Sequence, residues 1–315
     1  MSGSAFLRIP RTGAQVVGVI GASAVLALAV TGCGSATGAS VNSGQMGVGS
    51  GPESSRSSLA PPEADGVTWK AQGSKVDGVP VTYVARPDDS ISLLWMDSSI
   101  LKYRYVPGYK VPENGPECAD DRNPKTWMPK AAAGFNGGFQ LTDNAGGYYY
   151  LGKTIRPLKS GLGTIVIAQD GTAKVGKWGR DLELSADTAV VRQNLPLVVD
   201  SSKDQTSSRD TASTWGAADA GASHTNRSAI GQLADGSLVF AFGSLVTAPE
   251  LAKSLVDVGV VNAVALDMNK SWPTGFTYTH SQSKVTGSRI HPLVVRSPDE
   301  YKAQFQKDFF MAELP

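Results

Sequence analysis

Several polar residues stand together where a short apolar segment ends in the C-terminal part of the chain. Residues 261–266 are followed by Asp267, Asn269, Lys270 and Trp272. An apolar segment of this length is typical of a buried strand, and the end of such a strand can present polar groups to a ligand. A buried carboxylate is costly unless it is hydrogen-bonded or used in chemistry. Asp267 is therefore the first functional candidate, with turn capping as its structural alternative.

A second apolar segment, residues 131–135, leads into Asn136, Gly137 and Gly138. Two glycines allow the backbone to approach a ligand closely, and the same residues are also suited to a turn. Arg227 stands just before another apolar segment, where its planar guanidinium could bind a phosphate or carboxylate or form a structural ion pair. Both a binding and a structural role stay open for these residues.

The elements that must position these candidates are mainly short strands. They are rich in Val, Ile and Leu and are bounded by Gly, Pro or Asp. The expected strands are residues 90–97, 163–169, 195–200, 228–233, 237–243, 262–267 and 291–296. Asp170-Gly171 and Asp235-Gly236 lie between such segments, and these pairs tolerate the positive φ of a tight hairpin. The sheet is therefore expected to be at least partly antiparallel.

Two helices are expected. Residues 247–259 carry Pro249 in the first turn and end at Gly259. Ser297 and Glu300 predict a capping box for a second helix, whose four-residue spacing of aromatic side chains predicts core packing for Tyr301, Phe305 and Phe309. Few helices on a largely antiparallel sheet predict an α+β fold in a single large domain.

The N-terminus has the pattern of a bacterial lipoprotein signal peptide, residues 1–32. Arg8 and Arg11 precede the apolar stretch 14–30, and small residues come directly before Cys33. The pattern predicts cleavage before Cys33 and a diacylglycerol on its sulfur. The protein would then be exported and anchored to the outer face of the cytoplasmic membrane. An uncleaved membrane anchor is the alternative, although the stretch is short for a span.

Two parts follow the signal peptide. Residues 33–65 comprise Cys33 and a segment with six Gly and eight Ser, which is typical of a flexible tether. Residues 66–315 are long enough for one large domain. Loss of Arg8 and Arg11 from 29 basic residues would leave 27 against 28 acidic ones, a balance that does not indicate nucleic-acid binding.

Several familiar catalytic patterns do not occur in the sequence, including GxSxG, HExxH and paired CxxC. His224, His280 and His291 stand apart, so a multi-histidine metal site is not expected. No cofactor is predicted, with a bound divalent cation as an open alternative. Cys118 has no His or basic residue close in sequence, which favours a free thiol over a nucleophile.

The order of several motifs is similar to that of the phosphodiester glycosidase family. The motifs are FNGGF (135–139), GTIVIAQDG (163–171), LPLVVD (195–200), NRSAIGQLADGSLVFAFG (226–243), PELAKSLVDVG (249–259) and VNAVALD (261–267). The resemblance covers about residues 80–296 and implies curved antiparallel sheets around a few helices. It also implies a pocket in which Asn136, Arg227 and Asp267 meet.

One motif departs from the family. The family's usual ending is an Asp followed by Gly-Gly-Gly-Ser, whereas this chain has DMNKS, residues 267–271, followed by Trp272. Asp267 and Ser271 keep their places, and the variant resembles a divergent actinobacterial branch. Because glycine permits backbone conformations that Met, Asn and Lys resist, the loop must have a different geometry.

The resemblance implies cleavage of the bond between a sugar's anomeric carbon and a phosphate oxygen. Arg227 would bind the phosphate with support from Lys270 or His224, and Asp267 would be the nucleophile or the base on water. Asp143 is a candidate second carboxylate, so a retaining or inverting outcome stays open. The other residues expected to contact the substrate are Asn136, Gly137, Gly138, Phe139, Asn269, Ser271 and Trp272.

The chain is thus interpreted as a cell-surface lipoprotein that hydrolyses a glycosyl phosphodiester in envelope or exported glycans. A lipoprotein that binds or assembles a glycan or sugar phosphate without cleaving it is the alternative, and a structural envelope protein is a third. The expected partners are a glycan or sugar-phosphate substrate and the membrane, the latter through the lipid on Cys33. Sugar, aglycone and oligomeric state stay open.

Overall fold

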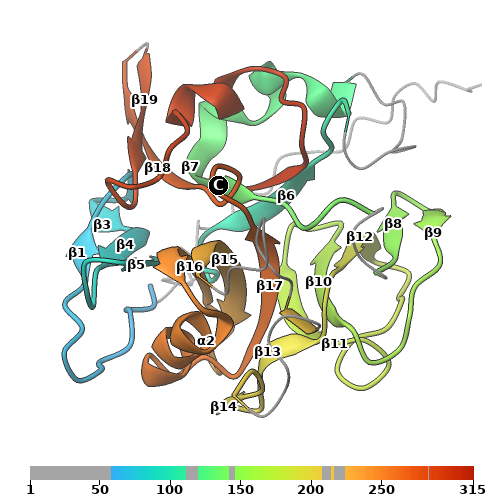
Figure 1. Cartoon of the computed structure of the whole chain (residues 1–315). Coiled ribbons are helices and arrows are strands. Elements are labelled where there is room, and N and C mark those ends of the chain that lie inside the picture. Colours follow the sequence, from blue (N-terminus) through green and yellow to red (C-terminus); the bar gives the residue numbers. More distant parts are fainter. Residues whose placement is uncertain (1–57, 111–119, 142–145, 208–213, 216–223, 283) are drawn as a thin grey trace, which may run out of the picture. The chain divides into compact units, whose positions relative to one another are not determined.

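The computed structural model describes residues 58–315 except 111–119, 142–145, 208–213, 216–223 and 283 (Figure 1). The predicted signal peptide and Cys33 lie outside the described residues, as do Cys118 and Asp143. The described residues belong to one compact unit, Ser54–Pro315. Leu59, which precedes the predicted domain 66–315, donates its backbone N–H to the Asp97 carboxylate at 3.0 Å.

The largest sheet has eight strands, and every neighbouring pair in it is antiparallel. In spatial order the strands are β1 (Lys70–Ala71), β4 (Thr82–Ala85), β5 (Ile91–Met96), β16 (Leu238–Val246), β15 (Thr225–Gln232), β17 (Asn262–Met268), β13 (Leu197–Asp200) and β14 (Lys203–Asp204). The helix α2 (Ala248–Asp257) packs against it, as Figure 1 shows.

Two five-stranded antiparallel sheets complete the frame. The first runs β11 (Ala173–Lys177), β10 (Gly163–Ala168), β12 (Thr188–Gln193), β8 (Tyr148–Tyr150) and β9 (Lys153–Arg156). The second runs β19 (Lys284–Arg289), β18 (Gly275–Ser281), β7 (Ala131–Asn136), β20 (Phe309–Glu313) and β6 (Lys102–Val106). A small ribbon pairs β2 (Lys75–Val76) with β3 (Val79–Pro80).

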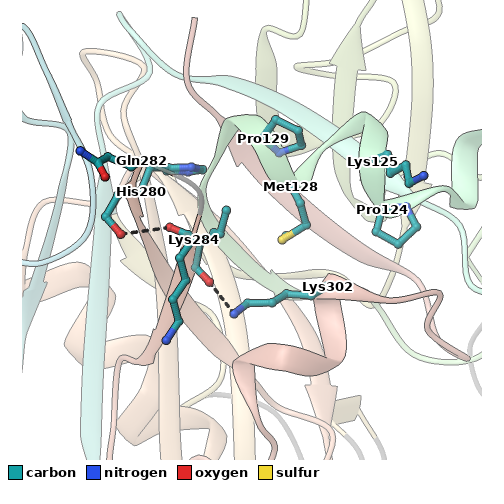
Figure 2. Close-up of a pocket in the computed structure, with 10 residues that line it drawn as sticks. Pro124, Lys125, Met128, Pro129, His280, Gln282, Lys284 and Lys302 are labelled. Carbon is teal, nitrogen blue, oxygen red and sulfur yellow. Dashed lines mark hydrogen bonds between the residues drawn. The ribbon is translucent and has the colours of Figure 1, made fainter.

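Short 3-10 helices lie in the connections between strands of the second five-stranded sheet. They are η1 (Asp120–Arg122), η2 (Pro124–Thr126), η3 (Met128–Lys130) and η5 (Pro298–Lys302). Residues of η2, η3 and η5 line one groove together with the β18–β19 hairpin (Figure 2).

Six of the seven predicted strands are confirmed, as β5, β10, β13, β15, β16 and β17. Both predicted Asp-Gly hairpins are also confirmed, with φ of +80° at Gly171 and +91° at Gly236. The strand expected at 291–296 is wrong. Val294 donates its N–H to the carbonyl of His291 at 3.2 Å, which makes a turn there.

The first predicted helix is confirmed as α2. Thr247 caps it, with Glu250 completing a capping box, and Gly259 follows with a φ of +80°. The second predicted helix is wrong, because only Pro298–Lys302 forms a 3-10 turn and the chain then enters β20. Glu300 pairs with Arg296 at 2.7 Å instead of closing a capping box.

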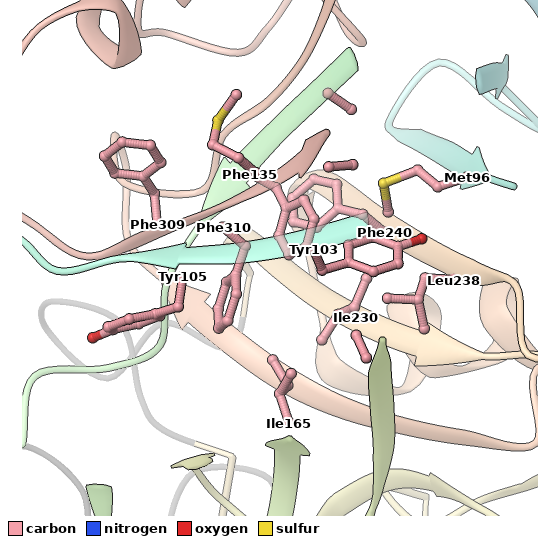
Figure 3. Packing of buried hydrophobic residues seen from close by; sticks show 14 of the residues in the cluster. Met96, Tyr103, Tyr105, Phe135, Ile165, Ile230, Leu238, Phe240, Phe309 and Phe310 are labelled. Atoms are coloured by element: carbon pink, nitrogen blue, oxygen red, sulfur yellow. The ribbon is translucent and has the colours of Figure 1, made fainter. Parts of the chain in front are cut away.

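The aromatic residues of that segment nevertheless pack in the core, as predicted. Tyr301 stacks on Phe309 with ring centroids 4.1 Å apart, and Phe305 meets Tyr301 edge-on. The main cluster joins all three large sheets, and Phe135 stacks on both Phe240 and Phe310 (Figure 3). Large aromatic surfaces of this kind contribute strongly to core stability.

The eight-stranded sheet is buried on both faces. Along β16, Leu238, Phe240 and Phe242 join the main cluster, whereas Val239 and Ala241 join a second cluster that includes α2. This alternation follows the two-residue period of a strand. The predicted single α+β domain of largely antiparallel sheets with few helices is thus confirmed. Within the described ranges, no helix has the length and hydropathy needed to cross a membrane.

Candidate active site

Three of the predicted residues meet where β7, β15 and β17 come together. Register places Ser228 of β15 opposite Asp267 of β17, and Arg227 opposite Met268. Asn136, at the end of β7, donates to the Ser228 hydroxyl at 3.0 Å, and that hydroxyl lies 3.3 Å from the Asp267 amide. Ser228 therefore links the strand that carries Asn136 with the one that carries Asp267.

Asp267 has the most unusual electrostatic surroundings of the site. The residue is only 6% exposed, and its carboxylate accepts a hydrogen bond from Lys307 at 2.9 Å and one from the Met268 amide at 2.8 Å. Burial raises the pKa of the Asp267 carboxyl, while the positive charge of Lys307 lowers it. Lys307 therefore favours the ionised carboxylate in a place where burial alone opposes it.

Lys307 was not among the residues predicted for the site. It stands in the segment expected to be helical, 40 residues from its partner. Its ammonium also lies 4.5 Å from the ring centroid of Trp272. Both contacts form between distant segments, so neither composition nor spacing could have identified them.

A second buried ion pair lies one residue further along the chain. Asp308 accepts hydrogen bonds from Arg192 and from the Tyr105 hydroxyl, each at 3.0 Å. Gly137 and Gly138 pack against this pair. A Cβ on Gly137 would lie 2.4 Å from the Asp308 carboxyl carbon. Close approach to this ion pair thus explains Gly137, whose own N–H donates to the Asp308 carbonyl at 2.9 Å.

The side-chain amide of Asn136 is held by several hydrogen bonds. Its oxygen accepts from the Thr274 amide at 3.0 Å, and its nitrogen donates to the Gly137 carbonyl at 2.8 Å as well as to Ser228. These bonds fix the junction of β7, β15 and the segment leading into β18. Asn136 therefore orders the site, and its contact with a sugar hydroxyl stays a prediction.

Arg227 is buried beside the carboxylate. Its guanidinium donates to the backbone carbonyls of Val246 at 3.1 Å and Trp215 at 3.0 Å, and burial lowers the pKa of this group. Arg227, Asp267 and Phe139 line one cavity, together with other residues of β15 and β17. Its volume of about 10 Å³ is room for about one water molecule.

The loop after Asp267 is fixed by its own polar residues. Asn269 accepts from the Ser271 amide at 3.0 Å, and the Lys270 carbonyl accepts from the side chain of Asn226 at 3.0 Å. These bonds give the loop a defined shape without the glycines of the family pattern. The Lys270 side chain is exposed.

Two other residues predicted to contact the substrate lie at the margins of the candidate active site. The Trp272 ring has the guanidinium carbon of Arg296 3.8 Å from its centroid, so it takes part in a cation–π contact within the protein. His224 is exposed and comes directly before β15. Sugar stacking by Trp272 and phosphate support by His224 stay predictions.

One segment matches a phosphate-binding sequence pattern but has a different structure. Residues 147–154 read GYYYLGKT, which fits GxxxxGK[ST]. That motif needs a loop that opens a helix. Here Leu151 and Gly152, both with positive φ, form the turn between β8 and β9. The segment is therefore a hairpin.

Part of the chain is similar in sequence to a known protein family. Residues 129–267 match the sequence profile of the phosphodiester glycosidase family. The match includes Asn136, Arg227 and Asp267, and it ends where Met268 begins the departure from the family's glycines. No curated protein matches the chain.

Solved structures show weaker similarity. The zebrafish N-acetylglucosamine-1-phosphodiester alpha-N-acetylglucosaminidase catalytic domain, auto-inhibited by pro-peptide, is 14% identical, with a TM-score of 0.45 over 79% of this chain and 81% of that one. A hypothetical protein from Synechocystis is 12% identical, with a TM-score of 0.38 over 82% and 64% of the two chains. A putative exported protein from Burkholderia pseudomallei K96243 is 13% identical, with a TM-score of 0.39 over 75% of each.

The geometry provides a buried carboxylate, a lysine whose charge favours the ionised form of that carboxylate, and a buried guanidinium in the same cavity. In this combination the carboxylate can act as a nucleophile or a base, while the guanidinium can bind an anionic group of a ligand close by. In the part of the chain that the structure describes, no group of three His, Cys, Asp or Glu side chains could hold a metal ion.

Proposed function

We propose that the chain is a cell-surface lipoprotein that hydrolyses a glycosyl phosphodiester, between the sugar's anomeric carbon and a phosphate oxygen. The observation that carries the proposal is the buried Asp267 carboxylate. It is paired with Lys307 at 2.9 Å and shares a cavity with Arg227, within a domain of the phosphodiester glycosidase family.

The proposed reaction needs little help from a general acid. A phosphate is a better leaving group than an alcohol, so positive charge near it replaces much of that help. Asp267 takes a proton from water, the water oxygen bonds to the anomeric carbon, and the bond from that carbon to the phosphate oxygen breaks. The phosphate leaves with the electron pair as a monoester near Arg227. Direct attack by Asp267, followed by hydrolysis of the glycosyl-enzyme, is the retaining form.

A binding function without cleavage is the second candidate. The volume of the cavity beside Asp267, about 10 Å³, is far below that of a sugar ring. The replaced glycines also leave a loop fixed by the Asn269–Ser271 hydrogen bond. A substrate must therefore displace local side chains before catalysis, whereas a binder could hold a ligand at the rim.

The deciding experiment is sugar release from a panel of α- and β-linked glycosyl phosphodiesters by the purified full-length protein. Asp267→Asn should lower kcat by about 10³-fold, within the usual range for a catalytic acid or base. Asp257→Asn on the exposed side of α2 is the matched control and should keep full activity. Binding of a sugar phosphate without release from any substrate would favour the non-catalytic function.

Arg227 can be tested with the same panel. Arg227→Gln should reduce kcat/KM for phosphodiesters at least about tenfold more than for neutral glycosides, because only the former present a phosphate. Equal losses on both would assign Arg227 to the scaffold through its bonds to Val246 and Trp215.

The proposed location has its own test. Cys33→Ser should abolish lipid attachment and release the protein from the membrane fraction, while the mass of the wild-type protein should show cleavage before Cys33 and an added diacylglycerol. Membrane association that persists in the variant would support an uncleaved anchor.

A further inference from the structure

A groove of about 550 Å³ lies away from the candidate active site. Its walls come from the β18–β19 hairpin, the η2–η3 segment and η5 (Figure 2). We propose that this groove binds phosphate groups of a glycan strand whose phosphodiester is cleaved at Asp267. This inference rests on the proposed function. It implies that the substrate is a polymer with more than one phosphate.

The groove has a local excess of positive charge. Lys125, Lys284 and Lys302 line it, and none of the described lining residues is Asp or Glu. The whole chain is almost balanced, with 29 basic and 28 acidic residues, so three lysines without an acidic lining residue are a local excess. Asp299 pairs with Lys302 at 2.7 Å from outside the lining and offsets one charge. Lys125 and Lys284 are exposed and remain the main cations.

The groove is shaped before any ligand binds. Lys302 donates to the Val285 carbonyl at 2.6 Å, which holds its ammonium against the hairpin. His280 and the Ala131 carbonyl are hydrogen-bonded at 2.7 Å, which fixes the other side. Met128 is buried and contributes an apolar lining. Apolar walls have a low dielectric constant and focus the field of the lysines toward an anion in the groove.

The types of side chain favour phosphate. Lysine presents a compact charge with three donors, which suits the oxygens of a phosphate, whereas the planar fork of arginine binds phosphate and carboxylate alike. Among the described residues that line the groove, none is Arg, Phe, Tyr or Trp. Recognition therefore depends on charge, without ring stacking on a base or sugar.

Two strands connect the groove with the candidate active site. β7 runs from Ala131, bonded to His280 of the groove, to Asn136 of the active site. β18 runs between the same places, since Thr274, just before it, donates to Asn136. Five steps along a strand span roughly 17 Å. A strand of a few sugar units is long enough to contact both places.

The test measures binding of tripolyphosphate to the purified full-length protein by isothermal titration calorimetry. The variant Lys125→Gln/Lys284→Gln/Lys302→Gln should weaken binding at least about tenfold. The control Lys153→Gln/Lys174→Gln/Lys203→Gln removes three exposed lysines elsewhere and should change it less than about twofold. If the groove variant unfolds, Lys125→Gln/Lys284→Gln takes its place, because both side chains are exposed. Equal affinities in the groove variant and the control would overturn the proposal.

Catalysis separates this inference from the proposed function. The groove variant should keep wild-type kcat/KM on a monomeric glycosyl phosphodiester and show a raised KM on a polymer with repeated phosphates. The wild-type protein could bind tripolyphosphate through the groove and yet cleave no phosphodiester. That result would support the anion site and contradict the proposed hydrolase function. Equal KM values of wild type and groove variant on the polymer would reject the groove as a substrate site while the hydrolase stands.

Discussion

Lys307 and Asp308 are neighbours in the chain, yet their ion pairs have different surroundings. The side chains of Arg192 and Asp308 are each 1% exposed and lie within the packed frame, whereas those of Lys307 and Asp267 are 10% and 7% exposed. Asp267 also lines a cavity that it shares with Arg227. Burial is common to both pairs, so access to a cavity is what separates the functional candidate from the structural pair.

Both pairs join the sheets near β20. Arg192 belongs to β12 and Asp267 to β17, while Lys307 and Asp308 come just before β20. Breaking a buried pair leaves an unpaired charge, which costs more than the pair itself contributes. The structural pair should therefore show its effect in unfolding, and the other pair in catalysis.

The largest effect is expected from Asp308→Ala. This change leaves the Arg192 guanidinium buried without its carboxylate and should lower the free energy of unfolding by about 3–5 kcal/mol in urea denaturation. The double variant Arg192→Met/Asp308→Leu replaces the pair with apolar side chains and should regain most of the loss. An equal loss in the single and double variants would contradict the unpaired-charge explanation.

Lys307→Met should act on catalysis and its pH dependence. Burial raises the pKa of Asp267 above its ordinary value and Lys307 lowers it, so removal of Lys307 raises this pKa further. Asp267 must be ionised to act, so activity should disappear at a higher pH than in wild type as the pH falls. At the wild-type optimum, kcat/KM should fall roughly 10- to 100-fold, the equivalent of a charged hydrogen bond.

The control for this prediction is Lys307→Arg, which keeps the positive charge. Its profile of kcat/KM against pH should have an acid limb close to that of wild type. An acid limb in Lys307→Met that does not move would show that Lys307 acts on the fold rather than on the carboxylate.

Gly137→Ala tests the close packing on the structural pair. Its Cβ would lie 2.4 Å from the Asp308 carboxyl carbon and 2.6 Å from the Asp308 carbonyl oxygen, so the free energy of unfolding should fall by about 1–3 kcal/mol. At Gly138 the nearest atoms lie at 3.4 Å, an ordinary contact, and Gly138→Ala should cost less. If thermal unfolding ranks the two variants the other way round, the packing explanation is wrong.

The smallest effect is expected from Trp272→Leu. The ring lies 3.8 Å from the Arg296 guanidinium carbon and 4.5 Å from the Lys307 ammonium, and loss of these contacts should destabilise the protein by about 1 kcal/mol. A raised KM with unchanged stability would instead assign the ring to sugar stacking.

The sequence predicted the strands better than it predicted the end of the chain. Segments such as 262–267 are apolar, short and bounded by turn residues, and these local signals persist in the fold. Tyr301, Phe305 and Phe309 fit a helix by spacing, but Phe309 is the first residue of β20, which lies between β7 and β6. Tertiary pairing decided the conformation there, and local spacing could not show it.

In the candidate site, too, residues with a local sequence signal could be predicted and residues that depend on tertiary contacts could not. Asn136 and Asp267 could be found because they follow apolar strands. Lys307 and Arg192 could not be found, because each acts through a partner that only the fold brings near. The Asn-Gly-Gly segment was predicted as a place where the backbone could approach a ligand. In the structure Gly137 packs closely against Asp308, and the contact with a ligand stays a prediction.

The position of Lys307 and Asp308 near the C-terminus has a consequence for biosynthesis. Chains emerge from the ribosome N-terminus first, and the other strands among the described residues are made before β20. Until the last segment docks, Asp267 lacks its lysine and Arg192 lacks its carboxylate. The site is thus completed only when the segment that carries Lys307 and Asp308 has been made, and a chain that stops short of this segment leaves both of those partners unpaired.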